Sequence, residues 1–237
     1  MKLKIVAIIQ ARMGSSRFPG KMSAILNGYT IIEWVIRRVK ESELIQNIVL
    51  ATSTKKENDY LERIAHSFEI KIFRGDEENV LSRFVKIAEI YKPNIIIRIC
   101  ADNPFITASE IDRIIKVFIK RKPDYAFNHV PKLGNNYVDG LGVEVFSKQL
   151  LDKIALKASA KKYLEHVTLY IWDHPVNFTI ETIKAPSEFS YPNISLDVDT
   201  EERFIYLQKH LAKVHDSKIA PEHFNVRKII TSMREST

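Results

Sequence analysis

The chain has 237 residues, of which 45% are hydrophobic and 27% charged, a balance typical of a folded globular protein rather than a disordered or fibrous one. Its net charge of +7 fits a polyphosphate ligand. The positive residues are scattered, with no run of five like charges, so nucleic acid is not an expected partner. The single cysteine excludes an internal disulfide, and no apolar stretch approaches the length of a membrane span. We therefore expect a cytoplasmic protein that is not attached to a membrane.

In the first half of the chain, apolar β-branched runs alternate with helical patterns. We predict strands over residues 3–9, 48–51, 70–73 and 94–99, and helices over residues 30–40, 57–68, 77–91 and 107–121. The last of these helices begins with a capping pattern, Thr107 followed three residues later by Glu110. Cys100 ends an apolar run, which favours a buried strand cysteine over a reactive thiol. The alternation predicts an α/β fold with a mainly parallel sheet covered on both faces, where ligands bind at the carboxyl ends of the strands.

The second half is less regular. We predict strands over residues 125–127, 143–146, 177–183 and 194–198, and helices over residues 147–154, 158–172 and 201–210. A polar and aromatic loop over residues 128–142 separates the first two strands. No linker or repeat divides the chain, so we expect one domain over residues 1–237.

The loop after the first predicted strand is rich in groups that bind phosphate. It offers cations, glycines and hydroxyls, carried by Arg12, Gly14, Ser15, Ser16, Arg17, Gly20 and Lys21. Arginine can pair with two phosphate oxygens at once, lysine supplies a compact charge, and glycine lets the backbone approach a ligand closely. The pattern is neither the three-glycine dinucleotide motif nor a P-loop, because Met22 follows Lys21 where the P-loop has Ser or Thr. The alternative is a solvated basic loop, but these residues exceed what a turn needs.

The stretch Ile9-Gln10-Ala11-Arg12-Met13-Gly14-Ser15-Ser16-Arg17-Phe18-Pro19-Gly20-Lys21 closely resembles the signature of the cytidylyltransferase family that activates acidic sugars. That family includes the synthetases of CMP-Kdo and CMP-neuraminic acid. Residues 74–83, 139–146, 165–168 and 196–200 extend the resemblance over most of the chain and favour the branch of the spore coat polysaccharide biosynthesis protein F. The resemblance implies a three-layer Rossmann-like nucleotide-diphospho-sugar transferase fold with a mainly parallel mixed sheet, and a homodimer. It also implies that residues 1–122 form the nucleotide-binding half of the domain, and residues 123–237 the acceptor-binding half with the dimerisation elements.

The resemblance also implies which residues bind the nucleotide. It gives this role to Gln10, Ala11, Arg12, Met13, Gly14, Ser15, Ser16, Arg17, Lys21, Thr52, Asn79, Arg83 and Ala101. Arg83 is equally consistent with an ordinary surface position on its predicted helix.

Two aspartates follow predicted strands and are candidate magnesium ligands. By resemblance, Asp102 and Asp199 hold Mg²⁺, an ion that is usually bound by one or two carboxylates together with substrate phosphates. The family commonly has glycine where this chain has Ala101, which removes no ligand. Asp197 is an alternative to Asp199, because a spacing of two along a strand places both side chains on one face.

The acceptor would bind in the second half. By resemblance its site comprises His129, Tyr137, Asp139, Glu144 and His166. Tyr137 is equally consistent with a core position and His166 with an ordinary helix position. Gly142 replaces the second aspartate of the family's Asp-Gly-Leu-Asp-Val-Glu-Val-Phe pattern, a change that would affect acceptor specificity.

These residues together predict a CTP-dependent cytidylyltransferase. An acceptor such as a Kdo-like or nonulosonic acid sugar would attack the α-phosphate of CTP, pyrophosphate would leave, and Arg12, Lys21 and Asp102 would be catalytic. Two alternatives stay open at this point. One is a nucleotide-sugar-dependent glycosyltransferase of the same fold, since Asp197-Val198-Asp199 is an Asp-x-Asp sequence. The other is a non-catalytic module that binds nucleotides or nucleic acid.

Overall fold

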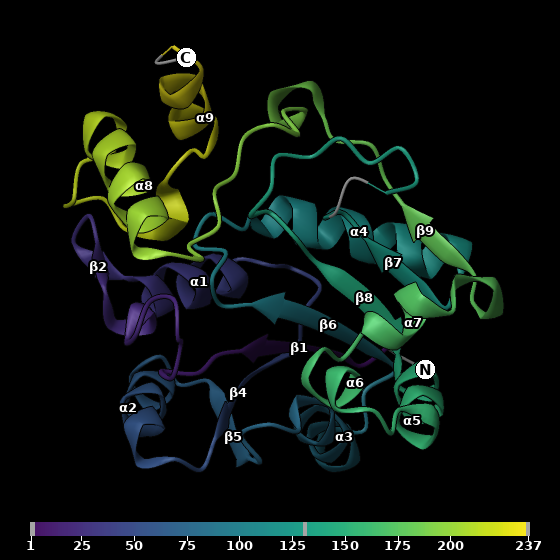
Figure 1. Cartoon of the computed structure of the whole chain (residues 1–237). Helices are drawn as coiled ribbons and strands as arrows, with labels where there is room; N and C mark the ends of the chain where they lie inside the picture. Colours follow the sequence, from purple (N-terminus) through teal and green to yellow (C-terminus); the bar gives the residue numbers. More distant parts are fainter. Residues whose placement is uncertain (1–2, 130–131, 236–237) are drawn as a thin grey trace.

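The computed structural model describes residues 3–129 and 132–235, and within these residues seven strands form one central sheet (Figure 1). The strand order is β5-β4-β1-β6-β8-β7-β9. The bounds are β1 Ile5–Gln10, β4 Asn47–Ser53, β5 Lys71–Gly75, β6 Ile95–Cys100, β7 Tyr125–Phe127, β8 Glu144–Ser147 and β9 Ile180–Thr182. β8 runs antiparallel to both β6 and β7, whereas the other neighbours pair in parallel. The predicted mainly parallel mixed sheet is therefore confirmed.

The helices of the first half form where the apolar periodicity predicts them. They are α1 (Ile31–Lys40), α2 (Asp59–Ser67), α3 (Val80–Tyr91) and α4 (Ala108–Arg121). α1 begins with a full capping box between Thr30 and Glu33. The predicted cap of α4 is also present, because the Thr107 side chain accepts a hydrogen bond from the Glu110 backbone N–H.

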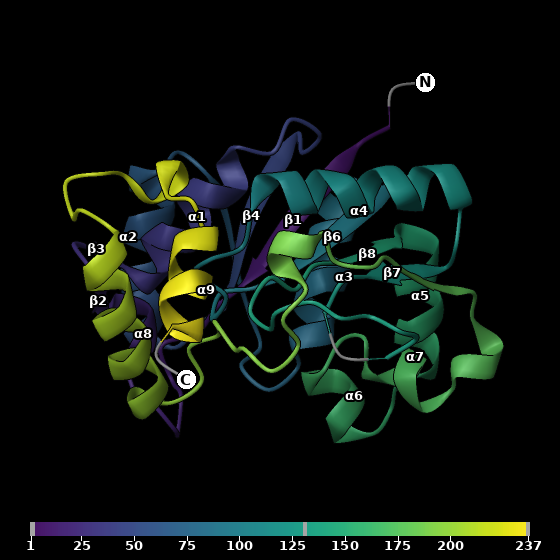
Figure 2. The same ribbon diagram turned by 90° about the horizontal axis from the view of Figure 1, so that it is seen from above.

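The sheet lies between two layers of helices (Figure 2). One hydrophobic cluster joins Ile5, Ala7 and Ile9 of β1 to α1, α2 and α4. The other joins Val6 and Ile8 to α3 and to α5 (Lys148–Lys157). Successive strand side chains point to opposite faces, so this split follows from the period of two. Along the described ranges, no helix combines the length and apolar character needed to cross a membrane.

The predicted helix over residues 158–172 is instead two short helices, α6 (Lys161–Glu165) and α7 (Leu169–Asp173). The break falls at His166, Val167 and Thr168. Val167 is fully buried in the cluster beneath α3 and α5, and two consecutive β-branched residues are poor helix formers. The helix is therefore interrupted over residues 166–168, where the chain turns Val167 into the core.

The predicted strand over residues 194–198 is also wrong. Only an isolated bridge links Asp139 and Ser195. The backbone N–H groups of Leu196 and Val198 donate to the carbonyls of Asp139 and Asp102, at 2.9 and 2.8 Å, so the segment bonds to loops instead of joining a strand ladder.

Apart from short 3₁₀ helices, four further elements occur in the described residues. They are the hairpin of β2 (Ile25–Leu26) and β3 (Tyr29–Thr30), α8 (Glu201–Val214), and α9 (Arg227–Arg234). The hairpin and α9 were not expected from the sequence, whereas α8 extends the helix predicted over residues 201–210.

Candidate active site

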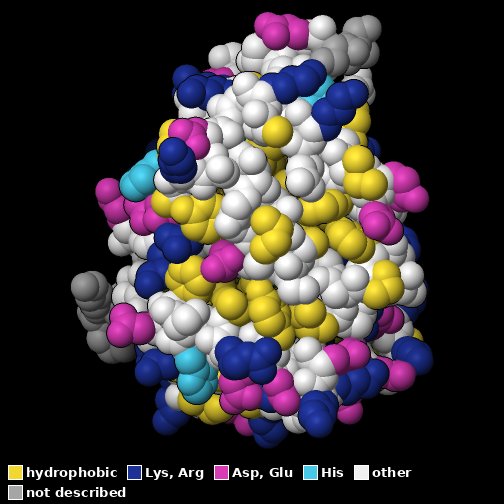
Figure 3. Space-filling model, turned by 90° about the vertical axis from the view of Figure 1, so that its left-hand side faces the viewer, with side chains coloured by type: hydrophobic (Ala, Val, Ile, Leu, Met, Phe, Trp, Pro, Cys, Tyr) yellow, Lys and Arg dark blue, Asp and Glu magenta, His cyan; other side chains and the backbone are white. Residues whose placement is uncertain are grey.

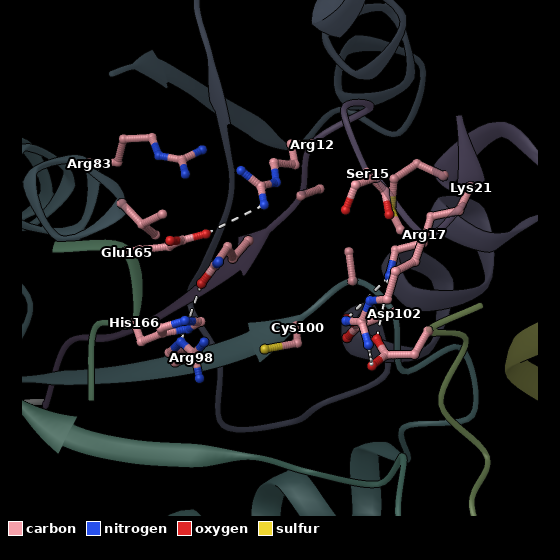
Figure 4. Close-up of a pocket in the computed structure, with 17 residues that line it drawn as sticks. Arg12, Ser15, Arg17, Lys21, Arg83, Arg98, Cys100, Asp102, Glu165 and His166 are labelled. Atoms are coloured by element: carbon pink, nitrogen blue, oxygen red, sulfur yellow. Dashed lines mark hydrogen bonds and ion pairs between the residues drawn. The ribbon is translucent and has the colours of Figure 1, made fainter. Parts of the chain in front are cut away.

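A cavity of about 270 Å³ opens at the carboxyl ends of β1 and β6 (Figure 4). Its walls come from the loop after β1, from α3, from the end of α6, and from the residue before Thr200, the cap of α8. The lining residues are Gln10, Ala11, Arg12, Ser15, Ser16, Arg17, Lys21, Met22, Val80, Arg83, Arg98, Cys100, Ala101, Asp102, Glu165, His166 and Asp199. Five of these side chains are cationic, which suits a polyanionic ligand.

The loop between β1 and Lys21 is held in place by backbone hydrogen bonds. The Ala11 N–H donates to the Ala51 carbonyl at 3.1 Å, and the Met13 N–H donates to the Asn58 side-chain oxygen at 2.8 Å. The Gly20 N–H then donates to the Met13 carbonyl at 3.1 Å, closing the loop on itself. Gly20 has a φ of 71°, a left-handed conformation that favours glycine. These constraints fix the backbone that carries Arg12, Arg17 and Lys21.

Each cation of this loop faces a carboxylate. Lys21 Nζ lies 3.4 Å from Asp102 and 3.8 Å from Asp199, and it donates to the Val198 carbonyl at 2.9 Å. Arg17 pairs with Asp199 at 3.0 Å. The Arg12 guanidinium lies 3.7 Å from Glu77 and 3.6 Å from Glu165. In this structure, carboxylate oxygens therefore pair with the cations that would bind the phosphate oxygens of a ligand.

Asp102 and Asp199 converge on one point, because the same Lys21 ammonium contacts both. In the part of the chain that the structure describes, no three His, Cys, Asp or Glu side chains gather as a complete metal site. Two carboxylates beside a phosphate site nevertheless match Mg²⁺, which takes few protein ligands and completes its shell with phosphate oxygens and water. Asp197 does not line the cavity, and its carboxylate accepts a hydrogen bond from Ser195. The residues present therefore fit the ion, with Asp199 placed at the cavity.

Arg83 lies on the α3 side of the cavity and is 1% exposed. Its Nε and Nη1 atoms have no hydrogen-bond partner among the described residues. Burial lowers the pKa of this guanidinium, while the charge of Glu77 opposes that effect. A buried donor without a partner costs free energy, so Arg83 is a group that a ligand would satisfy.

At the opposite end, Arg98 of β6 contacts two neighbouring strands. Its Nε donates to the side-chain oxygen of Gln10 at 3.3 Å, and its Nη1 donates to Glu144 at 2.6 Å. His129 Nε2 lies 2.9 Å from the same Glu144 oxygen. Burial alone would raise the pKa of Glu144, but the charge of Arg98 and the nearby His129 ring outweigh this effect and lower the pKa to about 2. Glu144 is therefore ionised at neutral pH.

Cys100 lines the cavity but is not an activated nucleophile. Burial raises the pKa of its thiol to about 12, with the charge of Arg98 opposing the effect. The thiol stays protonated at neutral pH, as expected of a strand cysteine with a structural role.

The structure brings many of the predicted nucleotide residues to the cavity but leaves four outside its lining: Met13, Gly14, Thr52 and Asn79. Asn79 caps α3 by accepting a hydrogen bond from the Ser82 N–H at 2.9 Å. The Thr52 hydroxyl is buried and has no hydrogen-bond partner among the described residues.

Of the predicted acceptor residues, His166 lines the cavity, whereas His129, Tyr137, Asp139 and Glu144 do not. The Tyr137 hydroxyl bonds to Glu110 and Arg113 of α4, which places this side chain in the core. Asp139 accepts a hydrogen bond from the Gly140 N–H at 2.8 Å, and burial followed by the charge of Asp197 raises its pKa. Residues 130–131 of the predicted acceptor loop lie outside the described residues.

Sequence reasoning missed five lining residues: Met22, Val80, Arg98, Cys100 and Glu165. Arg98 carried a usable signal, since a charged residue inside an apolar strand run needs a buried partner or a ligand. Glu165 belongs to the matching segment 165–168 but was given no role, because a glutamate at the end of a helix is ordinary on a protein surface.

Comparison with known proteins agrees with this geometry. A family model described as cytidylyltransferase matches residues 6–229. The spore coat polysaccharide biosynthesis protein SpsF of Bacillus subtilis is 38% identical over 204 residues, covering 84% of this chain and 83% of that protein. A solved cytidylyltransferase structure from Leptospira borgpetersenii superposes with a TM-score of 0.84 at 23% identity, covering 100% of this chain and 95% of that one.

A structure of CMP:2-keto-3-deoxy-manno-octonic acid synthetase complexed with CTP has a TM-score of 0.67 at 18% identity, covering 89% of this chain and 99% of that one. Likeness at this identity concerns the fold alone. The family model, which spans nearly the whole chain, carries the assignment together with the Bacillus relative. The chain belongs to the cytidylyltransferase family and is a nucleotidyltransferase.

Proposed function

We propose that the protein transfers CMP from CTP to an acidic sugar and releases pyrophosphate, in the cytoplasm and for the synthesis of a surface polysaccharide or glycoconjugate. The observation that carries this proposal is Lys21, whose buried ammonium lies between Asp102 and Asp199 in a cavity rich in cations. The names of two similar proteins support a sugar as the acceptor. One is a spore coat polysaccharide biosynthesis protein, and the other, a structural neighbour, is a CMP:2-keto-3-deoxy-manno-octonic acid synthetase.

In this reaction an acceptor oxygen attacks the α-phosphate of CTP. The new P–O bond forms as the bond to the β-phosphate breaks, pyrophosphate leaves, and the acceptor's proton is released. Arg12 and Arg17 bind the outer phosphates. Lys21 stabilises the charge that develops on the departing pyrophosphate, because its ammonium is preorganised by the Val198 carbonyl and two carboxylates.

Asp102 and Asp199 would hold Mg²⁺ beside the phosphates. When bound, the ion neutralises phosphate charge and orients the α-phosphate for in-line attack. Arg17, which pairs with Asp199 in this structure, would pair with a phosphate instead and leave the Asp199 carboxylate to the ion.

Arg83 supports cytosine as the base. Arg83 lines the cavity and its guanidinium only donates, so it would pair with N3 of cytosine, which accepts. Uracil carries a hydrogen on N3, so it would leave one buried Arg83 donor unsatisfied, which costs binding energy.

The test is a pyrophosphate-release assay with each nucleoside triphosphate and Mg²⁺ against sugar acids, including Kdo and N-acetylneuraminic acid. We expect release with CTP and one sugar acid, and loss of release when EDTA removes the metal. The proposal is wrong if no triphosphate is consumed with any acceptor and none raises the melting temperature in the presence of Mg²⁺.

A homodimer is part of the proposal. Hydrophobic side chains gather on the face formed by α8 and the β2–β3 hairpin, with charges of both signs around them (Figure 3). Ile25 on β2 and Ile205 on α8 are 53% and 60% exposed. A mixed rim suits a second copy of the same surface better than a membrane, which would favour basic residues alone.

A further inference from the structure

Three polar side chains lie at the carboxyl ends of β1 and β6 and at the amino end of β8, on the face of the sheet that α6 and α7 cover. Arg98 of β6 and Glu144 of β8 are direct cross-strand partners. Gln10 of β1 lies opposite Cys100, two residues beyond Arg98. Because side chains alternate along a strand, the three emerge on one face, above the apolar layer that contains Ile8 and Ile96.

Two hydrogen bonds fix the guanidinium plane of Arg98. Nε donates to Gln10 at 3.3 Å, and Nη1 donates to Glu144 at 2.6 Å. His129 Nε2 lies 2.9 Å from the same Glu144 oxygen. The side chain of Arg98 is 12% exposed and that of Glu144 only 5%. Arg98 therefore presents one defined edge to the cavity and has little freedom to turn.

This arrangement leaves two donors directed at a ligand. Nη2 of Arg98 makes no hydrogen bond with any described residue. Since arginine only donates, the Gln10 atom that faces it is the carbonyl oxygen, so the amide NH₂ of Gln10 is turned away from Arg98. Within residues 3–129 and 132–235 that NH₂ group also has no hydrogen-bond partner. Both side chains line the cavity.

Position separates Arg98 from the cations that face phosphate. Arg98 and His166 lie on one side of the cavity, whereas Arg17, Lys21 and Asp102 lie together on the other (Figure 4). Arg83 lies on the α3 wall, beside Arg12. In the proposed complex the phosphates contact Arg12, Arg17 and Lys21, and the base contacts Arg83. The remaining cationic residue in the lining of the described cavity is then Arg98.

We propose that Arg98 recognises the acceptor, binding its carboxylate through Nη2 together with the amide of Gln10. Glu144 already offsets most of the positive charge on the Arg98 guanidinium. The charge that is left suits a singly charged carboxylate better than a doubly charged phosphonate. The proposal rests on the CMP transfer proposed above and adds the residue that selects the acceptor. Glu144 and His129 are positioning residues that act through Arg98.

The test compares two acceptors in two proteins. The acceptors are the sugar acid that the wild type turns over, Kdo or N-acetylneuraminic acid, and its C1 carboxamide, which has the same shape without the charge. The variant is Arg98→Gln combined with Glu144→Gln, so that no buried charge is left unpaired. Glu144→Gln alone keeps Arg98 but removes its positioning partner, so it should retain part of the preference for the acid, and the melting temperature of each protein checks folding.

In the double variant we expect the KM for the sugar acid to rise about 10- to 100-fold, the scale of a lost charge-assisted hydrogen bond. The KM for CTP should change less than about threefold, and the preference for the acid over its amide should disappear, with Arg98→Lys restoring part of it. If the folded double variant keeps the wild-type preference, Arg98 does not bind the acceptor, while CMP transfer still stands. If the wild type itself releases no pyrophosphate with any sugar acid, the underlying reaction fails and this assignment fails with it.

Discussion

Lys21 has a different environment from the other cations of its loop. Its side chain is 11% exposed and fixed by three oxygens, whereas Arg17 is 63% exposed. A preorganised cation contributes most where charge develops, so Lys21→Ala should lower kcat about 100-fold or more while the KM for CTP changes less than about tenfold. Arg17→Ala is the control and should act mainly on KM. Steady-state kinetics measure both, and an equal loss of affinity and turnover in Lys21→Ala would reduce Lys21 to an anchor.

Glu144 should make stability depend on pH. Its pKa lies near 2 in the folded protein, against an ordinary value of 4.5, despite the opposing effect of burial. A lowered pKa stabilises the fold above 4.5, here by about 3 kcal/mol, and about half of this is lost by pH 3. The Glu144→Gln variant has no ionisable group at this position, so its stability should lack this part of the pH dependence.

Urea unfolding of the wild type and of Glu144→Gln at several pH values tests this expectation. The wild type should be more stable at pH 6, and its advantage should shrink between pH 5 and pH 3. A difference that stays constant over this range would mean that Glu144 is not ionised in the fold as described.

At the scale of elements, α6 is tied across the cavity by ion pairs. Glu165 at its end contacts Arg12, and Lys161 at its start contacts Glu78 at 3.0 Å. Glu165 therefore competes with the nucleotide for Arg12. Glu165→Gln should tighten CTP binding about two- to fivefold, the scale of one exposed ion pair.

Calorimetric titration of CTP into Glu165→Gln measures this effect. Glu78→Gln, which breaks the other pair of α6 without touching Arg12, should leave the affinity near the wild-type value. Weaker CTP binding by Glu165→Gln would show that Glu165 supports the nucleotide rather than competing with it.

The elements also show what the sequence can predict. Continuous apolar runs placed β1, β4 and β6, and β1 packs against helices on both of its faces. Helical patterns placed the helices between these strands, because each helix buries one apolar face against the sheet. The break before α7 and the unpaired segment over residues 194–198 were missed for a common reason. Val167 and Val198 are fully buried in irregular backbone, and a local pattern of buried β-branched residues looks the same there as in regular elements.

The residues of the candidate site also divide into those that local sequence patterns predict and those that they miss. The loop over residues 10–21 was found because its chemistry is continuous in sequence, and Asp102 and Asp199 because they follow strand-like segments. The partner of Arg98 became visible only when β6 paired with β8 and Glu144 came opposite it. Side-chain partners between strands depend on sheet order, which local patterns leave open.

At the scale of the whole molecule, the phosphate loop is continuous with the apolar face. Phe18 of the loop packs on Phe204 of α8 at 5.3 Å between ring centroids, and Asn27 of the hairpin donates to the His215 carbonyl after α8 at 2.8 Å. A dimer formed through this face would therefore brace the loop that carries Lys21. In a two-fold interface each substitution occurs twice, so its effect on the free energy of dimerisation is doubled.

We accordingly expect Ile205→Glu to convert a dimer into monomers in light-scattering or sedimentation measurements at micromolar concentration. It should also raise the KM for CTP, because Phe18 and Phe204 lose the support of the partner. Leu156→Glu is the control: Leu156 is 90% exposed on α5, which packs on the opposite face of the sheet, so this change should leave the mass unchanged. A wild type that is monomeric, or a Leu156→Glu variant that dissociates equally, would rule out α8 and the β2–β3 hairpin as the dimer surface, since specific association requires that one face differ from the rest.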